Sequence, residues 1–239
     1  MHIVIIGSGR AGTSFATAFR RVSFTTTLLH HDQVDLIGDD VDVVMLCVPD
    51  DALVSVASQV PVSDHRVVVH VAGSRTLEGL APHPRVASMH PLTTLLADGL
   101  GADRLAGAVY CVAGDALVDE LVAAVGGVAR RLDDAQRSRY HATATVAANH
   151  LVALLAHVES LAVSAGLTLE DFLPLARRAL EDVATYGPHE ALTGPASRGD
   201  MVTIDAHLQA IPESERATYV ALANAAFELA ELRRTEMLT

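Results

Sequence analysis

A glycine-rich turn near the N-terminus has the residue types and spacing that bind a dinucleotide. The motif GSGRAG directly follows the apolar run His2 to Ile6 and directly precedes a helix-like stretch. In this context Gly7 allows a tight turn, Gly9 lets the backbone approach a pyrophosphate, and Gly12 lets the helix pack closely on the strand. Free N–H groups and the helix dipole would then hold the anion. We therefore predict that the following residues bind a cofactor: Gly7, Ser8, Gly9, Arg10, Ala11 and Gly12.

The choice between NAD and NADP depends on the end of the second strand, about 20 residues after the last glycine. Asp32 could accept a hydrogen bond from a ribose diol and favour NAD, whereas His30 or His31 could lie against a 2′-phosphate and favour NADP. The residues leave both cofactors open. Few residues separate His30 from the next strand near Val41, so the adenosine side of the pocket is expected to be abridged. That shortening also puts cofactor affinity in question.

Other candidates follow the next strand-like runs, because ligands of an open α/β sheet bind at the carboxyl ends of its strands. His90 ends one run and is held by Pro91, so its imidazole could give a proton to a substrate beside a nicotinamide. A structural role fits the position of His90 equally well. His70 lies inside its run and is interpreted as a hydrogen-bonded core residue. The two preceding runs supply further candidates: Val48, Pro49 and Asp50 for the cofactor, then Gly73 and Ser74 for the substrate.

The composition restricts the chemistry. The chain of 239 residues has 17 basic and 29 acidic side chains, a formal net charge of −12, and every basic residue is arginine. Without lysine there can be no P-loop lysine, no Schiff-base lysine and no lysine general acid. The arginines are few and scattered, which argues against nucleic acid as a partner. An anionic substrate would have to bind to arginine, and Arg10 and Arg198 are the best placed.

Hydropathy and cysteine usage set further expectations. No apolar run reaches the roughly 18 to 20 residues that span a bilayer, and position 1 leads directly into a strand-like run. We expect a cytoplasmic protein with no membrane partner. Cys47 and Cys111 lie within apolar strand-like runs, so we expect buried free thiols rather than a disulfide or a metal site.

Strand-like and helix-like segments alternate through the first half of the chain, which predicts an α/β fold with a doubly wound, mostly parallel sheet. Continuous apolar runs such as VDVVMLCV fit strands that are covered on both faces. We predict a Rossmann dinucleotide-binding domain over residues 1–133 and an all-helical domain over residues 134–239. The strand-like runs are His2 to Ile6, Thr25 to His30, Val41 to Val48, Arg66 to Val71, Val86 to Met89 and Ala108 to Val112.

The second half begins with a long apolar helix. From Tyr140 to Ala165 apolar residues recur at spacings of four and three, and a neighbouring stripe is apolar too. A helix with two apolar sides is expected at the axis of a helical domain or of a dimer. Gly166 is placed to end it.

The boundaries of the later helices also show in the sequence. Thr168 with Asp171 three residues later resembles a capping box, and Pro174 is expected to split or kink the helix that follows. The segment LTGPASRGD reads as a structured loop. Asp200 is a good cap for the next helix, and Pro212 can open the last one.

Several motifs together resemble a known family, the Rossmann-like NAD(P)-binding proteins that carry a C-terminal helical domain of unknown function. This family is a branch of the 6-phosphogluconate dehydrogenase-like superfamily and is related to pyrroline-5-carboxylate reductases, and some members resemble ketopantoate reductases in role. The resemblance spans nearly the whole chain. It rests on these motifs in this order: GSGRAG, CVPDDAL, HVAGS, SMHPLTT, RYHATATVAANHLVALL, FLPLA and LTGPASRGD.

The resemblance implies an NADPH-dependent oxidoreductase that reduces a small carbonyl or imine, with a helical domain that tends to make dimers. We expect the substrate to be anionic, similar to ketopantoate or pyrroline carboxylate. It implies His90, His141 and Asn149 as catalytic residues. Better-known relatives carry a lysine four residues before the asparagine, where this chain has Thr145. Around the substrate the resemblance further implies Tyr140, Thr193, Arg198 and Asp200, in addition to Gly73 and Ser74 from the strand ends.

Plainer interpretations remain for these residues. His141 and Asn149 could simply hydrogen-bond to backbone on an apolar helix, and Arg198 could anchor its loop by pairing with Asp200. The residues favour an enzyme but do not decide between an enzyme and a non-catalytic protein. The alternative is a non-catalytic or degenerate protein that binds or senses a dinucleotide, which the abridged adenosine pocket and the missing lysine would suit.

Overall fold

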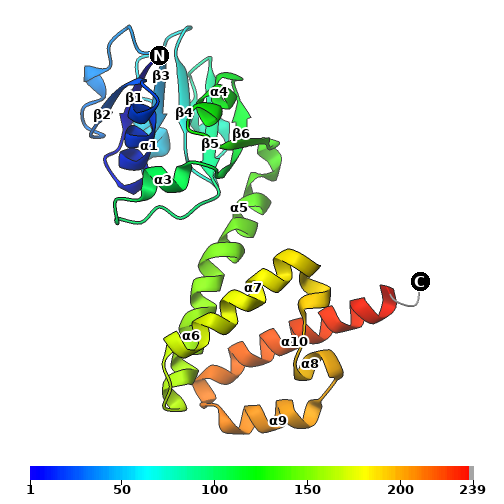
Figure 1. Cartoon of the computed structure of the whole chain (residues 1–239). Coiled ribbons are helices and arrows are strands. Elements are labelled where there is room, and N and C mark those ends of the chain that lie inside the picture. The colour runs from blue at the N-terminus through cyan, green and yellow to red at the C-terminus, as the bar shows by residue number, and fades with distance from the viewer. Residues whose placement is uncertain (237–239) are drawn as a thin grey trace. The chain divides into compact units, whose positions relative to one another are not determined.

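The computed structural model describes residues 1–236 and forms two compact units, Met1–Ala148 and Asn149–Thr239 (Figure 1). The predicted domain boundary at 133/134 coincides with the start of the helical half of the chain. The units divide later, inside the long helix, because the first turns of that helix are bonded to the sheet. Arg137 and Tyr140 both make hydrogen bonds to strand residues.

The first unit is built on one seven-stranded sheet in the order β2-β1-β3-β4-β5-β6-β7. All neighbours are parallel except β5 and β6, which confirms the predicted doubly wound, mostly parallel fold. The last strand was not predicted, because its sequence VARR is short, polar and mostly exposed. The strands are β1 His2–Ile6, β2 Thr25–Leu29, β3 Val43–Leu46, β4 Val67–His70, β5 Val86–Pro91, β6 Val109–Gly114 and β7 Val128–Arg131.

Helices cover both faces of this sheet (Figure 1). On one face Phe15 and Phe19 of α1 pack with Ile3 and Ile5 of β1, together with α3 and α4. On the other face α2 packs with the short helices η1 and η2. The helices of this unit are α1 Arg10–Arg21, η1 Val34–Leu36, α2 Leu53–Ala57, η2 Leu77–Leu80, α3 Gly101–Leu105, α4 Leu117–Ala124, η3 Asp134–Gln136 and α5 Arg137–Thr145.

The connection from β2 to β3 is short, as predicted. The three-residue 3-10 helix η1 stands where a fuller fold of this kind would carry a helix and a further strand. As a result β2 is the edge strand of the sheet. The adenosine side of a bound dinucleotide would therefore face the loop that begins at His30 rather than a longer wall of protein.

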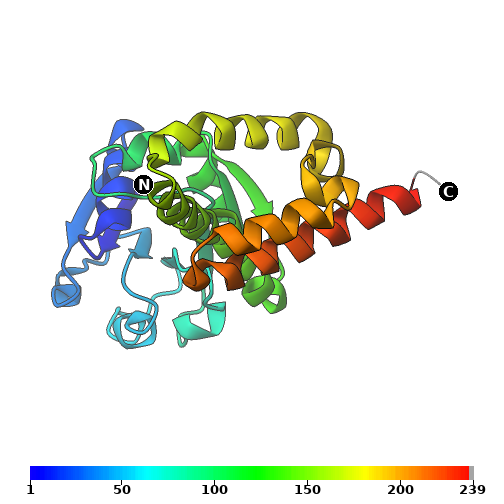
Figure 2. The ribbon, with the colours of Figure 1, turned by 90° about the horizontal axis from the view of Figure 1, so that it is seen from below.

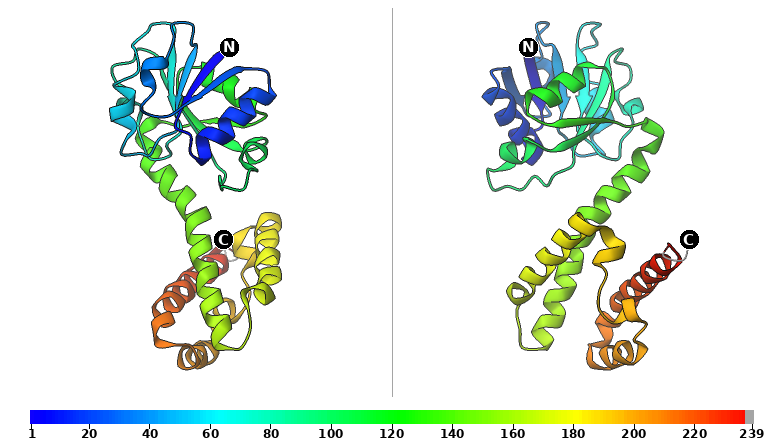
Figure 3. Two further views of the ribbon diagram at one scale, coloured as in Figure 1. Left: turned by 90° about the vertical axis from the view of Figure 1, so that its left-hand side faces the viewer. Right: turned by 45° about the vertical axis from the view of Figure 1, so that its right-hand side comes forward.

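The second unit is helical. The π-helical segment η4 Val146–His150 leads into α6 Leu151–Ser164, followed by α7 Leu169–Ala191, α8 Pro195–Arg198, α9 Met201–Ala210 and α10 Glu213–Glu236. Helix α7 contacts α6 and α10, and α8 packs against α9 and α10 (Figure 3).

Most of the predicted helix ends are found. Helix α6 ends at Ser164, just before Gly166 with φ +74°. The capping box of Thr168 and Asp171 is present, and Asp200 caps α9. The expected break at Pro174 is wrong, because α7 continues through it. The non-helical residue is Gly187, at φ 80° and ψ 165°, where α7 is kinked. Figure 2 shows that the chain changes direction before α8.

The helical unit buries few of its own apolar side chains. Its buried hydrophobic residues, among those described, are Ala162, Ala196, Ile204 and Ala230. In contrast, Val152 and Val163 of α6 are 68% and 69% exposed. The helical stretch Asp134–Ser164 is also long and apolar enough to cross a membrane by length and composition, a test that the core helix of a soluble protein and a signal sequence pass too.

Candidate functional site

The glycine turn after β1 has the backbone geometry that the motif predicts. Gly7 adopts φ +106° and its N–H donates to the carbonyl of Leu29, 2.9 Å away. A Cβ at Gly7 would collide with the carbonyl oxygen of Cys47, and one at Gly12 with the carbonyl oxygen of Gly7. Both glycines are therefore required by the packing of the turn itself.

Gly9 differs from the other two glycines, because the protein does not need a glycine there. A Cβ at Gly9 would meet no atom within 4 Å, and its φ of −74° suits any residue. Gly9 is the N-cap of α1, whose first turn carries no acidic side chain and no side-chain cap. The open space and the free N–H groups at the positive end of the helix fit a diphosphate.

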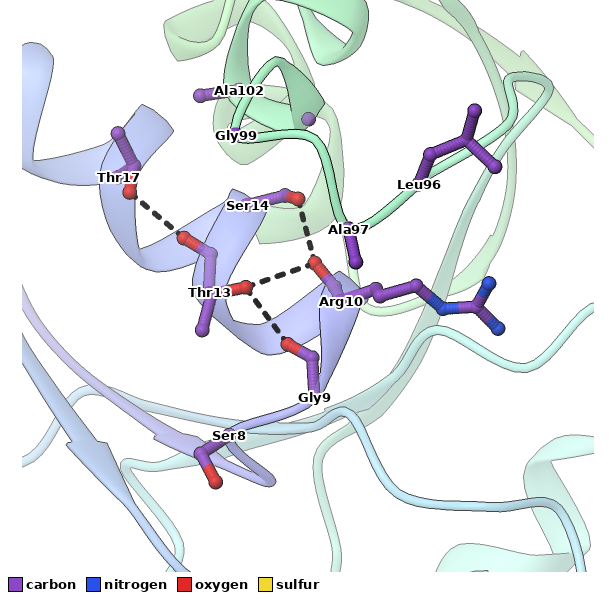
Figure 4. Close-up of a pocket in the computed structure, with 11 residues that line it drawn as sticks. Ser8, Gly9, Arg10, Thr13, Ser14, Thr17, Leu96, Ala97, Gly99 and Ala102 are labelled. Carbon is purple, nitrogen blue, oxygen red and sulfur yellow. Dashed lines mark hydrogen bonds between the residues drawn. The ribbon is translucent and has the colours of Figure 1, made fainter.

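A pocket of about 360 Å³ lies on one side of this turn (Figure 4). We call it the first pocket. The side chain of Arg10 extends toward the loop that carries Leu96 (Figure 4). Thr13 and Ser14 each donate a hydroxyl hydrogen bond to the carbonyl of Arg10. The sequence did not single out these hydroxyls, although a polar face directly after a glycine turn could have revealed them. The lining residues are Ser8, Gly9, Arg10, Thr13, Ser14, Thr17, Leu96, Ala97, Gly99, Gly101 and Ala102.

A second pocket of about 400 Å³ shares Ser8 and Gly9 with the first and lies at the ends of β1, β2 and β3. His30 and His31 line it and lie with ring centroids 4.1 Å apart. Asp32 does not line it. Its carboxylate accepts a hydrogen bond from His30 Nδ1 over 2.7 Å, which lowers the pKa of Asp32 below its ordinary value. The lining is completed by Gly7, Cys47, Val48, Pro49 and Ala52.

Asp50 and Ser74 meet at the ends of β3 and β4. The Ser74 hydroxyl donates to a carboxylate oxygen of Asp50 over 2.5 Å, and Arg75 Nε lies 3.8 Å from the same oxygen. These residues were predicted to contact different ligands, cofactor and substrate respectively. The structure joins them in one polar group.

A cluster of aromatic side chains forms beside β5, within the first unit. Tyr140 and His141 come from α5, fifty residues beyond His90, and the Tyr140 hydroxyl lies 2.5 Å from His90 Nδ1. The rings of His90 and His141 are 6.1 Å apart, edge to face. Gly73 lies against both: a Cβ there would be 2.5 Å from His141 Cδ2 and 2.8 Å from His90 Nε2. We call Gly73, His90, Tyr140 and His141 the His90 cluster.

Burial changes the proton affinities in this cluster. Loss of solvent lowers the pKa of His90 to about 4, and the nearby His141 and Arg137 add to the effect. Loss of solvent and a hydrogen bond with Cys111 raise the pKa of Tyr140 above its ordinary value. At neutral pH the imidazole of His90 is therefore uncharged and the Tyr140 hydroxyl keeps its proton.

Arg137 anchors α5 to the sheet beneath the His90 cluster. Its side chain is fully buried. Its guanidinium donates to Asp134 Oδ1 over 2.9 Å, to the hydroxyl of Ser88 on β5, and to the carbonyl of Ala72 at 3.5 Å. A buried cation is stabilised only with such partners. The sequence analysis missed this residue, and its spacing of three from Asp134 was the available sign.

His70, next to this group on β4, is buried as predicted, but the predicted hydrogen bonds are not found. Neither ring nitrogen has a partner among the described residues, and the residue is 0% exposed. Loss of solvent lowers its pKa to about 4, and the positive charge of Arg137 adds to this effect. His70 is therefore held neutral in the core.

The remaining candidates lie in the second unit. Asp200 accepts from the N–H and hydroxyl of Thr203, at 3.1 and 2.7 Å, as the cap of α9. No ion pair joins it to Arg198 within residues 1–236, although Arg198 contributes to the lowered pKa of Asp200 after those hydrogen bonds. Thr193 is exposed, between α7 and α8. Asp200 therefore has a structural role as the N-cap of α9.

Asn149 lies in the π-helical segment Val146–His150. Residues spaced four apart lie on the same face of an α-helix. They do not in a π-helix, because its turns are wider and its hydrogen bonds join residues i and i+5. Asn149 therefore does not continue the α-helical four-residue spacing of His141 and Thr145 on α5. Such segments frequently occur at functional sites.

Comparison with known proteins identifies the helical half. The family model described as a domain of unknown function, DUF2520, matches residues 111–226, a little under half of the chain. Over those residues the chain is similar to the DUF2520 family. The finding confirms the resemblance to Rossmann-like proteins with a C-terminal helical domain of unknown function. No curated protein sequence matches the chain.

Solved structures share the fold over nearly the whole chain. Protein TM1727 from Thermotoga maritima is 21% identical, with a TM-score of 0.75 over 97% of this chain and 99% of that one. A reductive aminase from Aspergillus terreus, in complex with NADPH4, cyclohexanone and allyl amine, is 19% identical, with a TM-score of 0.68 over 95% and 93%. Pyrroline carboxylate reductase from Plasmodium falciparum, with NADP bound, is 12% identical, with a TM-score of 0.61 over 98% and 98%. At these identities the likeness establishes the Rossmann-like fold.

Proposed function

We propose that this protein is an NADPH-dependent reductase of a small anionic carbonyl or imine. The observation that carries the proposal is Gly9. Nothing in the protein's own packing requires a glycine there, yet it caps α1 where two pockets meet. The diphosphate of a bound dinucleotide would lie on Gly9. The adenosine would then extend into the second pocket, and the nicotinamide would extend toward the carboxyl ends of the strands.

The second pocket supports NADP over NAD. Asp32, whose carboxylate would favour the ribose diol of NAD, is bonded to His30 instead, and His31 lines the pocket. An imidazole there can donate to a 2′-phosphate. The Aspergillus terreus and Plasmodium falciparum structures contain NADPH4 and NADP, which supports the same choice.

The residues of the first unit would divide the work of such a reaction. Gly9 and the first turn of α1 would hold the diphosphate, and Val48 and Pro49 would lie along the cofactor. The cofactor would supply the hydride. His90 at the carboxyl end of β5, with Tyr140 and His141, forms a partly buried group that can hold a proton near the reacting atoms.

The substrate class rests on charge and on the neighbours. Arg10 lines the first pocket, where a small anion could pair with its guanidinium, and Arg198 is the second candidate. Reductive amination and pyrroline carboxylate reduction are the activities that the names of two neighbours give. Both reduce a C=N bond, which supports an imine as much as a carbonyl.

The direct test is NADPH oxidation, followed at 340 nm, against ketopantoate, other 2-oxo acids and cyclic imino acids. We expect turnover of at least one of them, and binding of NADPH tighter than of NADH. Tight NADPH binding without turnover of any member would contradict the reductase.

The second candidate function is a non-catalytic protein that binds or senses a dinucleotide. The short η1 connection favours it, because that connection removes part of the adenosine wall. Titration separates the two candidates. A sensor would bind the dinucleotide and change its conformation without consuming it, and the lack of any affinity below millimolar would contradict both.

A homodimer through the helical unit forms part of the proposal. The described residues of this unit bury little more than Ala162, Ala196, Ile204 and Ala230, while Val152 and Val163 stay mostly exposed. Apolar surface of this extent on a small unit is typical of chains that complete their core with a second copy. The apolar stretch Asp134–Ser164 is suited to such an interface.

A further inference from the structure

The hydroxyl of Tyr140 is held from two directions by residues of neighbouring strands. His90 on β5 contacts it through Nδ1 at 2.5 Å, and the two rings are edge to face with centroids 5.6 Å apart. Cys111 lies opposite His90 in the antiparallel pairing of β5 and β6, and its thiol also hydrogen-bonds to the Tyr140 hydroxyl. A side chain on the first turns of α5 is thereby fixed against the sheet at its ligand-binding edge.

The charges around this pair decide which member can act as an acid. The positive Arg137 and the neighbouring His141 disfavour an imidazolium at His90, and the carboxylate of Asp50 only partly opposes them. His90 is thus an uncharged ring with one N–H. The Tyr140 hydroxyl remains protonated throughout the neutral range, for which burial is the main cause.

We propose that Tyr140 is the proton donor of the reduction and that His90 is a positioning residue, which holds the Tyr140 hydroxyl and returns a proton to it. This inference rests on the proposed reductase function. It changes the assignment made from the sequence, in which His90 itself was the donor and Tyr140 only lined the substrate.

The step is balanced in atoms and electrons. A hydride from the reduced nicotinamide forms a C–H bond at the C=O or C=N carbon, and the π electron pair moves to the heteroatom. The heteroatom takes the proton of Tyr140 as the phenolic O–H bond breaks. The developing alkoxide or amide anion is more basic than a phenolate, so the transfer is downhill even from a weakly acidic tyrosine.

The phenolate left behind is stabilised and reprotonated by His90. With its N–H on Nδ1, His90 donates a hydrogen bond to the phenolate oxygen over the observed 2.5 Å contact. That proton moves to the oxygen while Nε2 takes one from solvent. A side chain at position 73 would collide with Nε2, because a Cβ there would lie 2.8 Å from it.

The test compares Tyr140→Phe with the wild type and with a matched control. Tyr219→Phe is that control, because Tyr219 forms a similar pair with His207 Nδ1 at 2.7 Å in the second unit, and the two rings are also edge to face. We expect Tyr140→Phe to lower kcat for the panel substrate about 100-fold or more, with the Kd for NADPH unchanged. Tyr219→Phe should leave both within about twofold of the wild type.

Two further readouts do not depend on the rate of the loaded enzyme. The 2.5 Å contact predicts a strongly downfield exchangeable proton in the NMR spectrum of the cofactor-free protein, absent in both Tyr140→Phe and His90→Asn and present in Tyr219→Phe. In the ultraviolet titration, His90→Asn should shift the ionisation of Tyr140, identified by subtracting the Tyr140→Phe titration. A purely structural His90 would leave that ionisation in place.

The possible outcomes separate this proposal from the function on which it rests. Turnover by the wild type with an equal rate for Tyr140→Phe overturns the donor role and leaves the reductase standing. Binding of NADPH with no turnover of any panel member overturns the reductase function, and the donor role with it. Loss of turnover in Tyr140→Phe with intact NADPH binding and an unchanged melting temperature supports both.

Discussion

The carboxylate of Asp32 accepts a hydrogen bond from Nδ1 of His30 over 2.7 Å, directly after β2. That contact places the one acidic side chain of the HHD sequence against its own neighbour rather than in the second pocket. His31, whose ring contacts that of His30, lines the pocket instead. The selectivity between the two nicotinamide cofactors should therefore depend on His31.

We predict that His31→Ala weakens binding of NADPH about 10- to 100-fold, the value of one hydrogen bond to a charged group. Binding of NADH, which has no 2′-phosphate, should change less than twofold. Isothermal titration calorimetry measures both affinities. The matched variant Asp32→Asn should change neither affinity by more than twofold, because Asp32 does not line the pocket. Equal loss of both cofactors in His31→Ala would show that the ring contributes shape and no phosphate contact.

Gly9 and Gly12 should respond in opposite ways to the same substitution. Gly9→Ala adds a Cβ into open space at φ −74°, so we expect an unchanged free energy of unfolding and a loss of dinucleotide affinity of tenfold or more. Gly12→Ala drives a Cβ into the carbonyl oxygen of Gly7. It should cost about 1 to 3 kcal/mol of stability, as overpacked positions do.

Urea unfolding and NADPH titration of the two glycine variants check this contrast. If Gly9→Ala binds NADPH as tightly as the wild type, the diphosphate does not lie on the turn and the central observation of the proposed function is lost.

The sheet could be predicted from the sequence because its strands are apolar on both faces. A run such as VDVVMLCV has few alternatives to a central parallel strand, and the glycine motif fixes which helix follows the first strand. β7 lacks that pattern, since its residues Val128–Arg131 are mostly exposed and pair with β6 at the edge of the sheet. The predicted break at Pro174 was wrong because a proline in the second turn of a helix removes a single hydrogen bond. The capping box of Thr168 helps to offset that loss.

The sequence identified the residues of the candidate site better than it identified the contacts between them. The glycine turn, His90 and Tyr140 carry recognisable motifs. The contact between His90 and Tyr140 spans fifty residues, and no local rule gives such a pairing. The burial of Arg137, and the lack of a partner for His70 among the described residues, result from the packing of α5 on the sheet. That packing depends on the whole first unit.

His70 should make the protein sensitive to mild acid. Its pKa falls from an ordinary value near 6.5 to about 4 in the folded protein, mainly because it is buried. Between these values the unfolded chain binds a proton that the folded chain does not, so stability is complete above pH 6.5 and decreases as the pH falls toward 4. The loss attributable to His70 is at most about 1.4 kcal/mol per pH unit.

His70→Leu tests this acid sensitivity, since an apolar side chain replaces a ring whose nitrogens have no partner among the described residues. Unfolding free energies from urea titrations at pH 7.5 and 5.0 should differ less in His70→Leu than in the wild type. His150→Gln, at an exposed position, serves as the control and should keep the wild-type difference. His90 also has a lowered pKa, so part of the acid sensitivity should remain in His70→Leu. An identical pH dependence in His70→Leu and wild type would contradict the assignment.

The exposed face of α6 gives the sharpest test of the proposed dimer. Val152 is 68% exposed within one chain, so Val152→Glu should be harmless to a monomer. In a dimer the same glutamate would be buried against a second copy without a partner, at a cost of several kcal/mol. We therefore expect Val152→Glu to raise the Kd for dimerisation about 100-fold or more, measured by sedimentation equilibrium.

Val54→Glu is the matched control for that experiment, because Val54 on α2 is 57% exposed and lies on the sheet unit. It should leave the Kd for dimerisation unchanged. The melting temperature should fall only in Val152→Glu, because the helical unit buries few apolar side chains within one chain and would depend on the second copy for its core. A wild-type protein that is monomeric at micromolar concentration, or a Val152→Glu variant that dimerises like wild type, would show that the apolar face of α6 has another partner.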